Sequence, residues 1–161
     1  MLFRSKGAVL PVIKVLFEMD NTGSSTNRHG IAIFDGSMAI VGEGCGCDNA
    51  GGDGFYAHSN CFANLFGANF RNAGNRGIVA FNASLINAQG CNAEGANSIG
   101  VYATIGSVIS FQSGRARKGE NNSSSDIRVA YGSTIVHTGS GRTGGYSQTP
   151  LEITENGIIY A

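Results

Sequence analysis

The sequence contains no tryptophan, only 2 prolines among its 161 residues, and no excess of charge of either sign. Lys and Arg together number 11, and so do Asp and Glu, which gives a formal net charge of zero. A protein without net charge has no long-range field that would draw it to nucleic acid or to anionic lipid. We therefore expect neither of these as a partner.

Long apolar segments are also missing. The longest apolar stretch, residues 8–17, is interrupted by Pro11 and Lys14 and is too short to cross a bilayer as a helix. Residues 18–20, Glu-Met-Asp, follow it where a secretory signal would carry small residues for cleavage. We therefore expect no membrane insertion and no secretion signal.

Cysteine is sparse, and its spacing is unlike that of metal sites or disulfide frameworks. The four cysteines, Cys45, Cys47, Cys61 and Cys91, form no CxxC pair. Cys45 and Cys47 lie one residue apart, but a metal ion would need two further ligands that the sequence does not supply. We expect reduced thiols, no metal and no cofactor.

Glycine and asparagine, in contrast, are abundant, with 25 Gly and 15 Asn. Both residues tolerate the left-handed backbone conformation of tight corners, so the chain is expected to turn often. These turns recur at a nearly constant interval. Small residues mark one equivalent position in five repeats, with spacings of 24, 23, 23 and 26 residues: Ser37, Cys61, Ser84, Ser107 and Ser133.

Apolar residues recur at fixed offsets from these five anchors. Six positions before the anchor they are Ile31, Phe55, Ile78, Val101 and Ile127. Four before and two after it, every residue is again apolar. Alternating positions that face one side are typical of strands, and columns repeated once per coil are what a solenoid interior requires. The sequence therefore predicts an all-β, right-handed parallel β-helix of about five coils.

The repeat divides the chain into three parts. Residues 30–140 form the predicted coils, residues 1–29 precede them as a lead-in or cap, and residues 141–161 follow as a C-terminal cap. The last segment is expected to contain two short strands around a turn, in residues 149–154 and 156–160.

The coils "GVYATIGSVISFQSG" and "VAYGSTIVHTGSG", followed by "GGYSQTPLEITENGIIYA", resemble the C-terminal part of bacteriophage tail spikes and tail fibres. The resemblance covers residues 30–161 and is closest to tail spikes with capsule-polysaccharide lyase activity. It implies a trimeric β-helix in the virion tail, assembled in the bacterial host cytoplasm. No catalytic residue is carried over, because no motif here matches a lyase or hydrolase site.

Two functions follow from this resemblance. The favoured one is a C-terminal trimerisation module that binds host-surface polysaccharide, either capsule or lipopolysaccharide, as part of a larger spike or fibre. The alternative is a polysaccharide-degrading fragment, a lyase or a hydrolase, with an active site between subunits. A chain of this size without a recognisable catalytic motif favours the first, so we expect no enzymatic activity from this chain alone.

Aromatic side chains at outward offsets are candidates for glycan contact, since ring faces suit the apolar faces of sugars. The glycan-binding set that we predict is Tyr56, His58, Tyr102, Arg128 and Arg115. Tyr102 and Arg128 fall at the same offset one coil apart, where a lyase would place a base beside an arginine. Packing of these rings against a neighbouring subunit is an equally good explanation.

One further column is apolar although it lies an odd number of positions from the anchor, where the strand alternation predicts outward side chains. Its residues are Met38, Phe62, Leu85 and Val108. Either the corner bends it into the core, or it is buried between subunits at a threefold axis. We favour the trimer interface.

Asp48 and Asp53 are a carboxylate pair of the kind that glycosidases use, or ligands of a calcium loop, or ordinary corner residues. The Gly- and Asn-rich segment around them favours the corner. His29 and His137 have no recognisable partner in the sequence.

Overall fold

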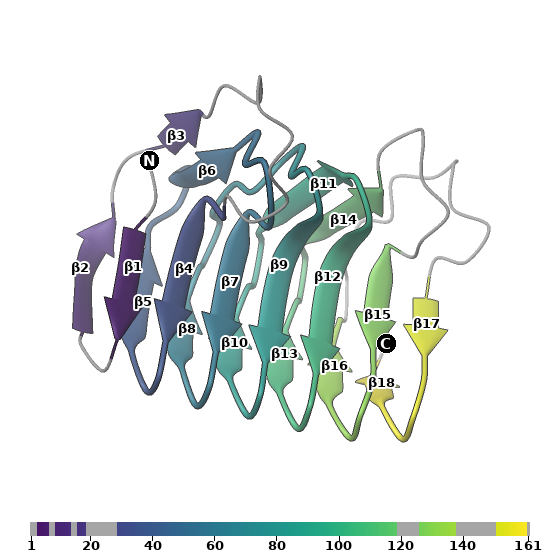
Figure 1. The fold of residues 1–161 in the computed structure, drawn as a ribbon. Coiled ribbons are helices and arrows are strands. Elements are labelled where there is room, and N and C mark those ends of the chain that lie inside the picture. The colour runs from purple at the N-terminus through teal and green to yellow at the C-terminus, as the bar shows by residue number, and fades with distance from the viewer. Residues whose placement is uncertain are drawn as a thin grey trace.

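The computed structural model describes residues 3–6, 9–13, 16–18, 29–118, 126–137 and 151–160. These residues form an all-β parallel β-solenoid of about four turns, in which each complete turn has three sides (Figure 1). The fold class predicted from the repeat is therefore confirmed, while its right-handedness and its trimeric state stay predictions. No helix occurs among the described residues, and hence none there that could cross a membrane.

Two seven-stranded sheets form the first two sides. The first, sheet A, runs along the front of Figure 1 in the order β1-β4-β7-β9-β12-β15-β17. Its strands are β1 (Phe3–Lys6), β4 (Ile31–Phe34), β7 (Phe55–His58), β9 (Arg76–Phe81), β12 (Ile99–Thr104), β15 (Ile127–Val129) and β17 (Leu151–Ile153). Sheet B lies behind it and consists of β2 (Val9–Ile13), β5 (Met38–Val41), β8 (Phe62–Asn64), β10 (Leu85–Asn87), β13 (Val108–Ser110), β16 (Thr134–Val136) and β18 (Ile158–Tyr160).

The third side is shorter and less regular. Its strands are β3 (Leu16–Glu18), β6 (Gly46–Asp48), β11 (Asn92–Ala96) and β14 (Arg115–Lys118). Asn69 joins β6 to β11 through two isolated parallel bridges, one to Gly46 and one to Asn92. The backbones approach closely here: a Cβ on Gly46 would lie 2.0 Å from the carbonyl oxygen of Asn69. Only glycine fits at that position.

The register between turns matches the columns expected from the sequence. Ile31 pairs with Phe55, and the same parallel pairing continues through Ile78, Val101 and Ile127. Every strand pair in the described residues is parallel, as a solenoid requires because each turn repeats the direction of the last.

The three sides enclose one hydrophobic core, in which apolar side chains stack in columns from turn to turn. The residues six before, four before and two after each anchor are all buried, with relative exposures of 0 or 1%. Phe55, Phe70 and Phe111 are its largest fully buried side chains. Alanine fills many neighbouring positions, so that large and small residues alternate within a narrow interior.

From β4 to β17, a corner of two left-handed residues connects each strand of sheet A to the next strand of sheet B. The pairs with positive φ are Asp35–Gly36, Ser59–Asn60, Asn82–Ala83, Ile105–Gly106, Tyr131–Gly132 and Glu155–Asn156. Directly after them, the buried anchor serines bond to one another between turns. Ser84 N–H donates to Ser107 Oγ at 3.2 Å, and Ser107 N–H donates to Ser133 Oγ at 3.0 Å. The recurring small anchor is thus a hydrogen-bonded ladder inside the corner.

The strands near both ends follow the same ladders. β1, β2 and β3 pair with β4, β5 and β6, while β17 and β18 pair with β15 and β16. The two strands expected near the C-terminus are present, and they join different sheets instead of pairing with each other. The division of the chain at residues 29 and 141, and the capping role of its ends, stay predictions.

Candidate functional site

Four of the five predicted glycan-contact residues lie on the outer face of sheet A. Tyr56 and His58 are in β7, Tyr102 is in β12 and Arg128 is in β15, and all four side chains are partly exposed. Arg115 does not join them, because β14 belongs to the third side of the solenoid. Arg115 belongs to none of the predicted columns, and the structure places it on another side of the turn.

The side chains on this face stack along the solenoid axis. His29 stacks on Tyr56 with ring centroids 4.7 Å apart and planes 7° from parallel. The guanidinium carbons of Arg76 and Arg128 lie 5.6 and 5.7 Å from the centroid of the Tyr102 ring. Arg76 comes from the turn before Tyr102 and Arg128 from the turn after it, so the ring lies between two cations.

A second stack runs beside the first. His58 stacks on Phe81 at 4.9 Å, and Phe34 lies 6.1 Å from His58 on its other side. Tyr56 contacts both Phe34 and His58, at 5.8 and 5.9 Å, and so joins the two stacks. The ring faces are therefore used within the chain, and it is the ring edges and polar tips that reach solvent.

The short outward residues between these stacks are buried. Val79 pairs with Tyr56 on one side and Tyr102 on the other, and it has no exposed surface. Ala32, Thr104 and Ala130 are similarly covered. Their outward parity was predicted correctly, but tall neighbours in the next turns exclude water from them.

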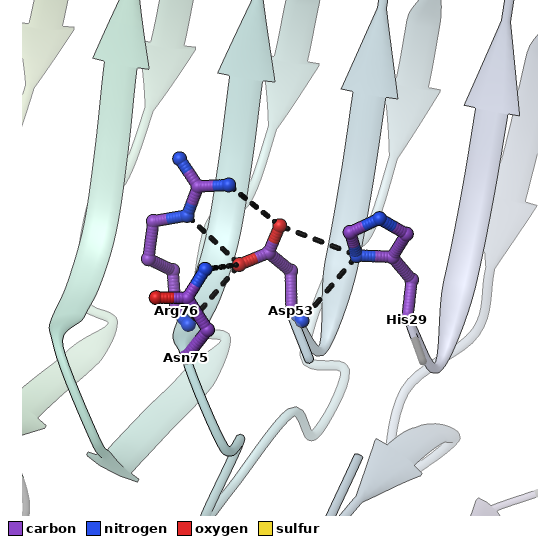
Figure 2. A network of polar contacts seen from close by, with 4 residues as sticks. All are labelled: His29, Asp53, Asn75 and Arg76. Atoms are coloured by element: carbon purple, nitrogen blue, oxygen red, sulfur yellow. Dashed lines mark hydrogen bonds and ion pairs between the residues drawn. The ribbon is translucent and has the colours of Figure 1, made fainter. Parts of the chain in front are cut away.

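Asp53 is the centre of a polar network at the edge of sheet A (Figure 2). Its carboxylate is fully buried and accepts hydrogen bonds from Arg76 Nε and Nη2, both at 2.8 Å, and from Asn75 Nδ2 at 3.0 Å. His29 Nδ1 lies 3.2 Å from Asp53 Oδ2. Nδ1 also accepts a hydrogen bond from the backbone N–H of Asp53 at 3.4 Å, so the two contacts require opposite states of Nδ1 and assign no single tautomer.

The network sets the protonation of Asp53. Burial alone would raise the pKa of this carboxyl, but the hydrogen bonds from His29 and Arg76 and the charge of Arg76 outweigh it and lower the pKa below its usual value. Burial also raises the pKa of the neighbouring Tyr56, and Arg76 partly opposes that change. Asp53 therefore stays ionised and holds Arg76 in place.

Asp48 has a similar role on the third side. It is 4% exposed, and its carboxylate accepts hydrogen bonds from the backbone N–H of Arg71 at 2.8 Å, from Arg71 Nε at 2.7 Å and from Arg71 Nη2. Both aspartates thus bind the arginine 23 residues later, one turn along the axis. Neither the catalytic pair nor the calcium loop is needed to explain them. Within the described residues, no three His, Cys, Asp or Glu side chains gather closely enough to hold a metal ion.

The apolar column of sheet B faces outward. Met38, Phe62, Leu85 and Val108 are 37 to 46% exposed, and their strand neighbours point into the core. The alternative that the corner bends this column into the core is therefore wrong. Its role as a trimer interface stays a prediction.

The four cysteines are free thiols, and all are buried. Burial raises the pKa of Cys47 to about 11 and that of Cys91 to about 12, and it also raises the pKa of Cys61. Cys61 replaces the anchor serine, with Sγ 3.1 Å from the carbonyl oxygen of His58. The thiols serve as small core residues.

Sequence reasoning missed the partners of Asp53. His29 lies 24 residues before it and Arg76 lies 23 residues after it, which are the spacings of the repeat itself. The same spacing links Asp48 to Arg71. A search for opposite charges one repeat apart would have found both pairs.

No protein-family model, no curated protein and no solved structure matches this chain. The fold and the chemistry of its faces are therefore the basis on which a function is proposed.

Proposed function

We propose that the chain is an assembly and host-glycan-binding module of a phage tail spike or fibre, acting as a homotrimer in the virion tail after assembly in the bacterial cytoplasm. The resemblance of its coils to tail spikes motivates this proposal. The difference between its outer faces, apolar on sheet B and polar on sheet A, supports it.

One observation carries the proposal: the outer face of sheet B has no charged residue from β5 to β18, and it exposes an apolar column that is interrupted only at Thr134. The outward residues, in chain order, are Met38, Ile40, Phe62, Asn64, Leu85, Asn87, Val108, Ser110, Thr134, Val136, Ile158 and Tyr160. Apolar patches of this kind on a single chain mark surfaces that another protein covers. Three copies meeting at a threefold axis would cover the column symmetrically.

The outer face of sheet A supports the glycan-binding part. Tyr56 and His58 present polar tips in one turn, Tyr102 lies two turns further along, and Arg128 lies in the turn after Tyr102. Successive turns are about 4.8 Å apart. Hydroxyl and carboxylate groups repeat along a polysaccharide in a comparable way. Because the ring faces are stacked within the chain, contact with sugar would use these tips and the ring edges.

A specific observation also favours the alternative, a polysaccharide-degrading site completed by a neighbouring subunit. His29 Nδ1 lies 3.2 Å from the buried carboxylate of Asp53, which orients the imidazole. An imidazole held in this way by a carboxylate is the usual arrangement of a general base.

The test is the solution mass of the purified chain by light scattering, followed by incubation of the same sample with host capsule polysaccharide. We expect a trimer that binds the polymer and leaves its length unchanged. Shortening of the polymer would favour the alternative. A well-folded monomer would contradict the assembly role.

Leu85→Asp places a charge in the apolar column and is expected to give folded monomers. Asn92→Asp, which adds the same charge on the third side, is the matched control and should leave the trimer intact. Dissociation of both variants would mean that net charge, and not the sheet B column, governs association.

A further inference from the structure

Two guanidinium groups on the outer face of sheet A have a defined separation. Arg76 and Arg128 lie on either side of the Tyr102 ring, at 5.6 and 5.7 Å from its centroid. Because they come from the turns before and after Tyr102, they are two turns apart along the axis. At a rise of about 4.8 Å per turn this separation is about 10 Å.

Each guanidinium is held from one side and leaves other N–H groups for a ligand. Asp53 fixes Arg76 through Nε and Nη2, and Nη1 takes no part in that contact. Glu152 lies 3.4 Å from Nε of Arg128, so both Nη groups of Arg128 lie outside that ion pair. The side chains are 21 and 36% exposed. Fixed, partly exposed guanidinium groups suit carboxylates, which they bind through paired hydrogen bonds.

The spacing indicates how a ligand would lie. One turn of the solenoid advances by nearly the length of one sugar unit in an extended glycan. A chain laid along the axis would therefore bring every second sugar to one of the two arginines. Tyr102 separates the two contacts, and its faces are already covered by the guanidinium groups, so the sugar between them would meet only the ring edge.

We propose that sheet A binds a linear acidic glycan along the solenoid axis, with the carboxylates of alternate sugars on Arg76 and Arg128. This inference rests on the proposed glycan-binding function and assigns its ligand class, its direction and its two anchoring residues. Two contacts on one ligand act together, because the second forms at the high effective concentration that the first creates.

The probe is a size series of hyaluronan oligosaccharides, in which carboxylates occur on alternate sugars, measured by isothermal titration calorimetry at fixed salt. We expect affinity to rise at least about tenfold from the disaccharide, with one carboxylate, to the tetrasaccharide, with two. The hexasaccharide should add little further. Chitotetraose, which has the same length and no carboxylate, should bind at least about tenfold more weakly than the hyaluronan tetrasaccharide.

Arg128→Gln is the decisive variant, because it leaves the network of Asp53 and Arg76 intact. It should abolish the rise between disaccharide and tetrasaccharide and reduce the salt dependence of tetrasaccharide binding. Arg117→Gln removes the same charge from the third side, in β14, and is the matched control, for which the rise should remain. Arg76→Gln should act like Arg128→Gln if circular dichroism shows that it folds.

Three results would overturn the inference: equal affinity for disaccharide and tetrasaccharide, equal binding of chitotetraose, or an equal loss in Arg117→Gln. If the chain binds host polysaccharide but no hyaluronan fragment, the inference is wrong and the proposed glycan-binding function stands. If it binds neither, both are wrong.

Discussion

The outer faces of sheets A and B are built from the same alternation of residues. They differ in how many of their outward side chains are covered by contacts within the chain. On sheet A, every tall side chain that we have described stacks on, or forms an ion pair with, a neighbour in an adjacent turn. On sheet B, the side chains also follow one another along the axis, but Phe62 and Leu85 remain 38 and 46% exposed. The comparison teaches that regular stacking alone does not remove an apolar column from water. Sheet B needs a partner, whereas sheet A already has most of its contacts and can offer its polar edges.

Removing the carboxylate at the centre of sheet A should have the largest effect on stability. Asp53→Asn leaves the partly exposed Arg76 beside a neutral amide, and breaking this largely buried ion pair costs about 3 kcal/mol. Urea denaturation at fixed protein concentration measures the loss. Asp35→Asn, at an exposed corner, should change stability by less than about 0.5 kcal/mol. A similar small change for Asp53→Asn would mean that the network contributes little.

Protonation of Asp53 at low pH should weaken the same network on sheet A, with a smaller loss of stability than Asp53→Asn causes. The folded-state pKa of Asp53 is lowered, so its contribution to stability is complete above the usual pKa of 3.8 and is lost as pH falls through the folded value. The described outward residues of sheet B contain no Asp, Glu or His. The free energy of unfolding should therefore decrease less between pH 7 and pH values below 4 in Asp53→Asn than in the wild type. An identical acid response would contradict this assignment.

Breaking the serine ladder, which lies in the corner between sheets A and B, should have the next largest effect on stability. Ser107→Ala removes the acceptor of the Ser84 N–H and leaves that buried donor without this bond, at a cost of about 1–3 kcal/mol. Ser110→Ala, three residues later on the outer face of sheet B, is the control and should be nearly neutral. Thermal unfolding of the two variants decides the matter; equal midpoints would show that the ladder contributes no stability.

The smallest expected change is a gain. Ile105 is an exposed, β-branched residue with φ of 52°, where the equivalent residue two turns earlier is Ser59 and one turn earlier is Asn82. Replacement by asparagine, which tolerates this conformation, should stabilise the chain by about 1 kcal/mol. Asn82→Ile should lower stability by a comparable amount. A loss of stability in Ile105→Asn would show instead that the isoleucine side chain has contacts worth more than the backbone strain.

The sequence was sufficient to predict the parallel solenoid, its strand register and the buried columns, because a repeat of 23 residues places chemically similar side chains at each step. It was insufficient for the site. The stacks on sheet A involve His29, which precedes β4, and Arg76, which is the first residue of β9, and neither belongs to the predicted columns. Arg115 lies on a different side from the rest of the predicted set, because distance along the chain does not indicate which of three sides a residue occupies.

The spacing between anchors departs from 23 residues in two of the four intervals, and the structure localises both departures. The extra residue of the first interval lies in the corner between β5 and β6, at residues 42–44, and the three extra residues of the last lie after β14 and before β15. In both cases the next strand of sheet A resumes its register. The chain can therefore gain or lose residues on the third side without disturbing the strand register of sheet A or sheet B. We expect a foreign peptide inserted between β14 and β15 to leave the pairing of β12 with β15 unchanged.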